Sequence, residues 1–508
     1  MGLWSFYFLG KLYLYFRGFV RFDFVLNLLF AFFLMLPLSK KLPALRFLKG
    51  LKFTLALVCA FFLLWHETWF PPLFRTVRLL SETGGISPGY IVRFLRDSFS
   101  LMEAGTLSLI FVVCFALNKR ITLTPLVLAG IIAVPLLAAK NTAAGIDNYL
   151  DNFYQSEAKR VIHFSEPNPN RPAFDVIILN ICSLAWDDLR TVGLENNEFL
   201  RQFDLLFTNF NTVSSYTNPS AIRLLRANCG QGRHKDLYRS TGNECYVLET
   251  LRGQGFKTYA AIDNDAPSYR FVEDIIAFGL ADKPIGITDL PVLQYDFDGT
   301  PIYDDLAILN RWWDMRRSSS QTKAALYMDI TTLHSGAHRA DDKEWWTRER
   351  ANLYREFAER LFGNLDEFFR TLSSSGRNFV VILVPEHGMA LRGSSIQPSD
   401  MREIPLPSIT TVPLGVKFIG QKFPRQPERQ IIVSKQTSYL AIAHLLSSFL
   451  ASPAFDRDSL LTEEIIKGIP EVNFVAENEA ALVVKKDGAF FFSGKTKKWD
   501  KLPSSELQ

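Results

Sequence analysis

The sequence predicts a bundle of apolar membrane helices followed by an α/β domain with a mostly parallel sheet. Three observations lead to this fold class. The chain has 508 residues, which is too long for one ordinary domain. Of its 43 Phe residues, 19 lie in the first 140 positions, where long apolar runs follow one another. The later part instead alternates short apolar runs with longer helical stretches.

Residues 1–139 are expected to form a transmembrane domain of about five helices, since each apolar run is near the ~20 residues that cross a hydrocarbon core. Basic residues gather between the second and third runs and between the fourth and fifth, which predicts that both loops are cytoplasmic. An odd number of spans then places the chain after residue 140 outside the cytoplasm. The expected spans are residues 4–20, 23–38, 51–66, 101–117 and 121–138.

Charged residues make two parts of this region less regular. Lys11, Arg17 and Arg21 interrupt the first two apolar runs. Residues 88–102 place apolar and charged side chains on opposite faces of a helix, which suits a helix lying in the membrane interface. The first turns of the next span would give the same pattern, so both interpretations stay open.

Residues 140–172 read as a polar linker, and a separate domain is expected over residues 173–508. Its short apolar runs, several of them continuous, are typical of strands buried on both faces of a sheet. Such strands are expected at residues 174–181, 257–263, 324–330, 379–385 and 414–420, with helices at 350–374 and 436–451. Strands alternating with helices predict a mostly parallel sheet, where ligands gather beyond the carboxyl ends of the strands. Asp487 and Gly488 predict a hairpin near the C-terminus.

The charge of the chain argues against nucleic acid as a partner. The formal net charge is only +4. Outside the expected membrane loops, no segment concentrates Lys and Arg as a nucleic-acid-binding surface would.

Of the five cysteines, two lie in the expected membrane region and three in the later domain. Cys59 and Cys114 lie in expected spans and are interpreted as packing residues. Cys229 and Cys245 bracket a short polar loop, which a disulfide could close in an oxidising compartment. Cys182 is left unpaired at the carboxyl end of the first expected strand, so it is either buried and inert or bound to something.

Several polar side chains follow the expected strands at the same edge as Cys182. Glu386 and His387 follow the fourth strand directly, and His334 follows the third by a few residues. Thiolate, imidazole and carboxylate together are the ligand set of zinc, whereas Mg²⁺ and Ca²⁺ prefer oxygen ligands alone. The sequence therefore predicts a zinc site here. His338 is interpreted as a loop residue, and the sequence assigns it no particular role.

The stretch "SSYTNPSAIRLLRANCG", residues 214–230, combines hydroxyls with a helix start. Asn218 or Thr217 is expected to cap the helix, with Pro219 at its first position. A Ser or Thr at such a place can be a fourth zinc ligand and a nucleophile for phosphoryl or sulfuryl transfer. Composition and spacing leave four candidate hydroxyls, Ser214, Ser215, Thr217 and Ser220.

Five motifs spread along the chain resemble one known family. They are "LNICSLAWDDL", "SYTNPSAIRLLRANCGQ", "FDGTPIYDDLAILNRWWD", "VPEHGMALRG" and "IPLPSITTVPLGVKF". With these motifs the sequence resembles the bacterial cellulose phosphoethanolamine transferases, over nearly the whole chain. That family has the alkaline phosphatase-like (sulfatase-like) fold in its catalytic domain. The resemblance implies that an α/β domain of this fold follows the membrane helices in the sequence.

The resemblance also implies roles for single residues. Zinc would be bound by Cys182, Glu386, His387 and the nucleophile, which is the residue after the Tyr of the "SY" pair, Thr217. His334 and Arg402 match residues placed around the phosphoryl group, and Cys229 and Cys245 match the family's disulfide. The family has Ser-Gly-Pro where this chain has Thr217, Asn218 and Pro219, and the related lipid A phosphoethanolamine transferases use Thr at that place.

The implied activity is a zinc-dependent transfer of phosphoethanolamine from phosphatidylethanolamine to glucose hydroxyls of secreted cellulose. The group would pass through a covalent ester on Thr217. The implied location is the bacterial inner membrane, with the catalytic domain in the periplasm beside the subunits of the cellulose synthase complex. Two alternatives stay open. One is transfer of the same group to lipid A, and the other is a non-catalytic structural subunit of the cellulose synthase complex.

Overall fold

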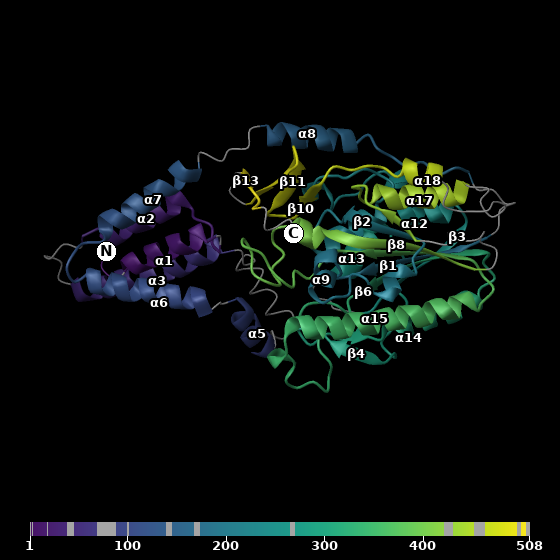
Figure 1. Cartoon of the computed structure of the whole chain (residues 1–508), viewed down its shortest axis with the longest axis horizontal. Coiled ribbons are helices and arrows are strands. Elements are labelled where there is room, and N and C mark those ends of the chain that lie inside the picture. The colour runs from purple at the N-terminus through teal and green to yellow at the C-terminus, as the bar shows by residue number, and fades with distance from the viewer. Residues whose placement is uncertain are drawn as a thin grey trace.

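The computed structural model describes most of the chain, in twelve segments. These are residue 2 and residues 4–17, 19–37, 45–68, 88–98, 101–138, 145–166, 173–264, 270–420, 430–451, 463–494 and 499–503. Figure 1 shows a group of N-terminal helices at one end of the molecule and an α/β domain at the other.

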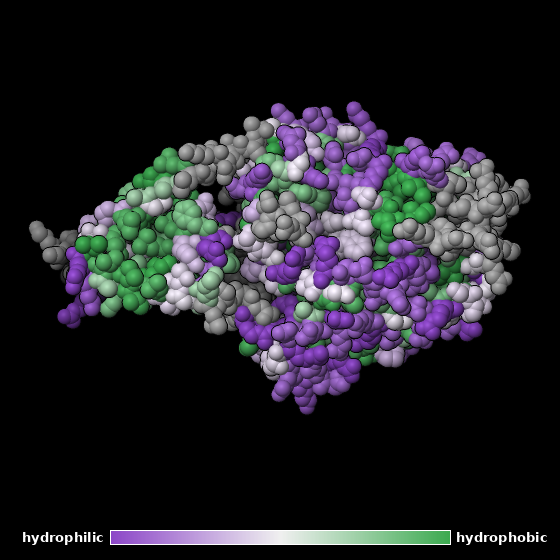
Figure 2. All heavy atoms as spheres, viewed as in Figure 1, coloured by the Kyte–Doolittle hydropathy of each residue, from purple (hydrophilic) through white to green (hydrophobic). Residues whose placement is uncertain are grey.

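The N-terminal helices coincide with the five apolar runs. They are α1 (Trp4–Phe16), α2 (Phe24–Met35), α3 (Leu45–Glu67), α6 (Leu101–Leu117) and α7 (Thr124–Ala138). Their outer surface is strongly apolar in Figure 2, as expected for a surface that faces lipid. Within the described residues, only Arg46–Glu67 is both long and apolar enough to cross a membrane, while α2, α6 and α7 are shorter apolar helices. The multi-span arrangement therefore remains a prediction.

The charged residues that interrupt the first apolar run have partners on other helices. The ammonium of Lys11 forms an ion pair with Glu67 of α3, and both side chains are only 1% exposed. Arg17 Nη2 lies 2.8 Å from Glu103 Oε1 of α6. The buried charge of Lys11 is tolerated because it is paired, and both ion pairs connect segments that are far apart in sequence.

The described part of residues 88–102 belongs to two helices. Helix α5 (Pro88–Ser98) is separate from α6, which begins at Leu101. This agrees with the interpretation of an independent amphipathic helix.

The segment predicted as a linker contains a further helix, α8 (Ile146–Glu157). Leu150, Phe153 and Tyr154 on its inner face are buried in a cluster with Leu440 and Val484 of the α/β domain. The apolar face of α8 explains why this part of the connector is ordered against the domain.

The central sheet has seven strands in the order β3-β6-β1-β7-β8-β2-β9. All five predicted strands are present, and β3, β6, β1, β7 run parallel, which confirms a mostly parallel sheet. One expectation was too simple, because β8 runs antiparallel to both of its neighbours. The strands are β1 (Asp175–Ile181), β2 (Leu205–Asn211), β3 (Phe256–Ile262), β6 (Lys323–Ile330), β7 (Phe379–Pro385), β8 (Thr411–Ile419) and β9 (Ile431–Val433).

Helices cover both faces of this sheet, and every residue of β1 and β7 is buried. In α15 (Arg350–Ser373) the buried residues Phe357, Leu361 and Leu365 recur every four positions, which gives the helix one apolar face against the sheet. Figure 1 shows α15 on one side of the sheet, with α12 and α17 on the other. Helices on the α15 side are α9 (Trp186–Thr191), α10 (Glu198–Arg201) and α14 (Asp305–Arg317); on the other side lie α11 (Thr217–Leu225), α12 (Val247–Gly253), α13 (Phe271–Gly279) and α17 (Leu440–Ala451).

Two small sheets and two short helices complete the domain. The predicted hairpin is confirmed, since β11 and β12 pair antiparallel around Asp487 and Gly488, whose φ angles are 50° and 76°. These remaining elements are β4 (Val292–Tyr295) with β5 (Pro301–Tyr303), β10 (Val475–Glu477), β11 (Leu482–Lys486), β12 (Ala489–Ser493), β13 (Trp499–Lys501), α16 (Pro407–Thr410) and α18 (Glu463–Gly468).

The disulfide between Cys229 and Cys245 is present and joins residues 16 positions apart in the sequence, which confirms the pairing. It fixes the end of α11 to the segment that leads into α12. Cys182 is buried and unpaired.

Replacing Cys229 and Cys245 together by Ser is expected to lower the free energy of unfolding by about 3 kcal/mol, because the closed loop restricts the unfolded chain. Thermal unfolding with and without a reductant measures this effect. The reductant should destabilise the parent protein and a Cys59→Ser control, but leave the double variant unchanged. A parent protein insensitive to the reductant would contradict the expectation.

Candidate functional site

Three adjacent parallel strands end together and create the site. In the sheet, β1 lies between β6 and β7, and Ile181 pairs in register with Ile330 and Pro385. The backbone N–H of Cys182 donates to Ile330 O at 2.8 Å, and that of Glu386 donates to Ile181 O at 2.9 Å. Residues that follow β1 and β7 therefore lie next to each other at one edge of the sheet.

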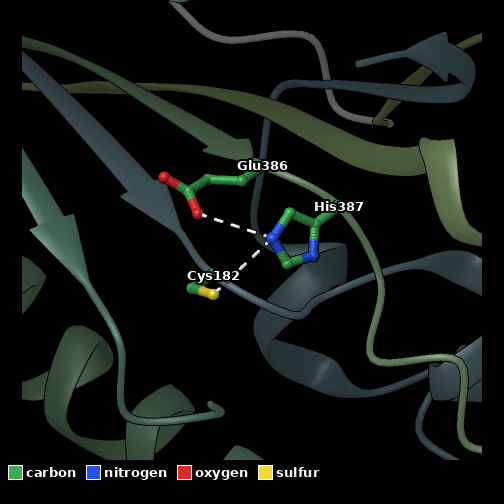
Figure 3. Close-up of side chains that lie close together, drawn as sticks. All are labelled: Cys182, Glu386 and His387. Carbon is green, nitrogen blue, oxygen red and sulfur yellow. Dashed lines mark hydrogen bonds and ion pairs between the residues drawn. The ribbon is translucent and has the colours of Figure 1, made fainter. Parts of the chain in front are cut away.

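Cys182, Glu386 and His387 form a buried cluster at this edge (Figure 3), with their potential ligand atoms all within 4.8 Å of one another. The His387 Nε2 atom lies 3.8 Å from Cys182 Sγ and 3.8 Å from Glu386 Oε2. His387 Nδ1 lies 3.0 Å from Gly388 O. A proton assigned to Nδ1 donates to this carbonyl and leaves the Nε2 lone pair facing the cluster.

The electrostatics of the cluster fit a bound cation. Burial, with the Glu386 carboxylate nearby, raises the pKa of the Cys182 thiol well above its usual value. Burial also raises the pKa of Glu386 and, together with the Arg402 charge, lowers that of His387. Glu386 Oε2 is buried and has no hydrogen-bond partner among the described residues. A divalent cation would compensate these groups, and their sulfur, nitrogen and oxygen donors suit zinc.

Of the four candidate hydroxyls, only the hydroxyl of Thr217 contacts this cluster. Thr217 Oγ1 lies 3.6 Å from Cys182 Sγ and 3.4 Å from His387 Nε2. The other three hydroxyls donate elsewhere: Ser214 Oγ to Asn478 Oδ1, Ser215 Oγ to Arg402 O and Ser220 Oγ to Ser214 O.

The start of α11 differs from the expected cap. The helix begins at Thr217, its capping position is Tyr216 without a side-chain cap, and Pro219 is the third helical residue. Asn218 does not cap because its amide donates to Asp274 Oδ2 at 2.7 Å. Thr217 is thus the first helical residue, where backbone N–H groups have no partner within the helix and favour an anion.

His334 lies beside the cluster rather than in it. The residue follows β6 after a short turn, and its Nδ1 lies 2.8 Å from Asp296 Oδ1. This contact orients the ring and leaves Nε2 for proton transfer. His338 packs against an aromatic side chain: its ring stacks on that of Trp345, with 4.5 Å between the ring centroids.

Arg402 brings a permanent positive charge to the same place. Its Nη1 lies 3.1 Å from His387 Nδ1 and 3.5 Å from Ser183 Oγ. Burial opposes the charged form, but Cys182 and Asp400 hold the pKa of Arg402 above its usual value. A charged guanidinium here can bind the oxygens of a phosphoryl group.

Some residues that contact the candidate site residues were not predicted from the sequence. Asn180 Nδ2 donates to Glu386 Oε1 at 2.6 Å and to Asp329 Oδ1 at 2.8 Å, so it orients the carboxylate. Asp296, the partner of His334, was also missed. Asn180 and Asp329 did leave a signal, since each is a polar residue near the carboxyl end of a mostly apolar strand.

The architecture and the site define a class: a chain with apolar N-terminal helices and an α/β domain that carries a candidate metal centre beside the hydroxyl of Thr217. Two family descriptions cover the chain, the cellulose biosynthesis protein BcsG N-terminal domain over residues 4–136 and its C-terminal domain over residues 134–499. The chain belongs to the BcsG family of cellulose biosynthesis proteins.

The most similar relatives agree with this membership. The chain is 32% identical to the cellulose biosynthesis protein BcsG of Escherichia coli (strain K12), with 95% of this chain and 92% of that protein covered. It is also 32% identical to BcsG of Salmonella typhimurium (strain LT2), with 96% and 93% covered. The solved lipooligosaccharide phosphoethanolamine transferase A (EptA) of Neisseria meningitidis matches 91% of this chain and 97% of its own, at 13% identity and a TM-score of 0.44.

Cys182→Ala is expected to abolish stoichiometric zinc binding, because it removes the only thiolate of the cluster. Elemental analysis of the full chain, purified without chelator, measures bound zinc per protein. Cys114→Ala is the matched control, since Cys114 is also buried but lies in α6. Equal zinc in the Cys182 variant and the parent would remove this residue from the ligand set.

Proposed function

We propose that this protein is a zinc-dependent transferase that moves phosphoethanolamine from phosphatidylethanolamine to hydroxyl groups of cellulose. The observation that carries the proposal is the contact of the Thr217 hydroxyl with Cys182 and His387 at the start of α11. Membership in the BcsG family supports cellulose as the acceptor. The proposed catalytic domain is residues 173–508, with an alkaline phosphatase-like arrangement.

Cys182, Glu386, His387 and Thr217 would hold the metal. Zinc, when bound, would lower the pKa of the Thr217 hydroxyl and neutralise charge on the phosphoryl oxygens. The buried Asn180 amide donates to the Glu386 carboxylate and so fixes its orientation within the cluster.

In the first step, the Thr217 oxygen, having lost its proton to solvent, would attack the phosphorus of phosphatidylethanolamine. A bond forms between this oxygen and phosphorus, and the bond from phosphorus to the glyceryl oxygen breaks. Protonated His334 gives its proton to that oxygen, so diacylglycerol leaves as a neutral alcohol. Arg402 offsets the negative charge on the phosphoryl oxygens while the geometry changes.

In the second step, a glucose hydroxyl of cellulose would attack the phosphorus of the Thr217 ester. Neutral His334 takes the proton of this hydroxyl, and the bond from phosphorus to Thr217 breaks. His334 is then protonated and Thr217 deprotonated, as at the start. The contact with Asp296 stabilises the positively charged ring in the intervals when His334 carries two protons.

The N-terminal helices give this reaction its location. The lipid donor resides in a bilayer, and apolar helices would keep the domain at its surface. We infer a multi-pass protein of the bacterial inner membrane whose catalytic domain lies in the periplasm, beside the subunits of the cellulose synthase complex. The Cys229–Cys245 disulfide suits that oxidising compartment.

Incubation of the full chain with phosphatidylethanolamine should add one phosphoethanolamine group to the peptide that contains Thr217. Mass spectrometry detects the group. Thr217→Ser should keep the adduct because it keeps the hydroxyl, whereas Thr217→Ala should lose it. Ser220→Ala is the control, since Ser220 Oγ donates to Ser214 O and does not contact the cluster. An adduct that persists in Thr217→Ala would rule out this nucleophile.

Cells that carry Thr217→Ala are expected to secrete cellulose without phosphoethanolamine, because the variant lacks the proposed nucleophile. Their lipid A should be unchanged, because lipid A is not the proposed acceptor. Solid-state NMR of the cellulose and mass spectrometry of lipid A give the two readouts. Loss of the group from lipid A alone would identify the other acceptor. A normally inserted variant that still modifies cellulose would instead favour a structural subunit.

A further inference from the structure

Helix α5 of the N-terminal region rests on the loop that carries His334 and on the turn that follows it. Figure 1 shows α5 between the apolar helices and the beginning of α15. A Cβ atom on Gly89 would lie 2.5 Å from the Trp346 ring, so only glycine allows this close approach. The Arg93 guanidinium lies 5.5 Å from the centre of the Trp345 ring, and Arg96 Nη1 donates to Thr347 O at 3.4 Å.

The ring of Tyr90 on this helix packs against both segments that hold His334. Gly336 follows His334 by two residues, and a Cβ on Gly336 would lie 2.9 Å from Tyr90 Cδ2. On the other side, the Tyr90 and Phe297 rings are 5.2 Å apart between centroids. Phe297 directly follows Asp296, the partner of His334 Nδ1, and its ring is 5.9 Å from that of His334.

The hydroxyl of Tyr90 reaches the segment that carries Arg402. It donates to Asp400 Oδ2 at 3.3 Å, and the same oxygen lies 2.9 Å from Arg350 Nη1. Burial would raise the pKa of Asp400, but the charges of Arg350 and Arg402 hold it below its usual value. The carboxylate is therefore charged and accepts from Tyr90. Asp400 has a φ of 71°, so its backbone conformation depends on such contacts.

We propose that Tyr90 is a positioning residue of the transferase site, which holds the His334 loop and the Arg402 loop in their working arrangement. The N-terminal region then completes the site as well as anchoring it. This inference rests on the proposed function. Its physical basis is that proton transfer and charge stabilisation both depend on placement within fractions of an ångström, and each loop is fixed from one side by this single aromatic side chain.

The test uses the full chain in detergent micelles that contain phosphatidylethanolamine, and follows the initial rate of adduct formation on Thr217 against lipid concentration. Tyr90→Ala should lower the rate at saturating lipid by about tenfold or more, with little change in the half-saturating concentration. Tyr90→Phe keeps the ring contacts with the His334 loop but loses the hydrogen bond to Asp400, so it should recover part of the loss. Val92→Ala on the same helix is the control, because Val92 is 58% exposed.

A second variant displaces α5 without altering Tyr90. Gly89→Leu should lower the saturating rate in the same way, because the new side chain collides with Trp346. Gly105→Leu is the matched control, since a Cβ there meets nothing within 4 Å. Gly89→Leu and its control provide the test if Tyr90→Ala does not insert into membranes.

The outcomes separate the two proposals. If the parent protein forms no adduct, the proposed function fails. If the parent forms the adduct and both Tyr90→Ala and Gly89→Leu match its rate per zinc-loaded protein, the positioning role is overturned, even where these variants unfold at lower temperature. A raised half-saturating lipid concentration with an unchanged saturating rate would also overturn it, because that result assigns α5 to lipid binding.

Discussion

The parallel alignment of β6, β1 and β7 is the constraint on which the rest of the site depends. Because Ile181 pairs in register with Ile330 on one side and Pro385 on the other, the chain leaves all three strands at the same level. The thiol of Cys182 and the side chains of Glu386 and His387 must then meet. A shift of one residue in any strand would turn these side chains to the opposite face of the sheet.

This alignment places ionisable groups where water cannot stabilise them. Cys182, Glu386 and His387 are buried at the edge of an apolar core, and burial favours the neutral form of each. A divalent cation would resolve the conflict, because it would supply the charge that solvent supplies elsewhere. The same argument explains the buried Asn180 amide, whose hydrogen bonds reach Glu386 and Asp329 from within the sheet.

In the N-terminal region too, a buried charged group is compensated by a group of opposite charge. Lys11 on α1 is buried against Glu67 on α3, which links two helices whose outer surfaces are apolar. Helix α5 instead makes aromatic and charged contacts with segments of the α/β domain that lie near His334. In the proposed reaction a lipid donor and a polymeric acceptor would meet at one phosphorus atom, and α5 contacts the segments next to His334 and Arg402 that would act there.

The sequence by itself determined the features that depend on local pattern. The five strand runs, the hairpin at Asp487 and Gly488 and the set of residues after the strands could all be recognised, because buried strands are continuous apolar runs and turns need particular residues. Even the pairing of Cys229 with Cys245 was accessible, since few cysteines lay outside the apolar runs. Tertiary structure alone decided the antiparallel direction of β8, the pairing of His334 with Asp296, the choice of the Thr217 hydroxyl by geometry and the contact of Tyr90 with Asp400. Each of these joins residues from distant segments, and such contacts are fixed by how whole elements pack rather than by the neighbours of a residue in the chain.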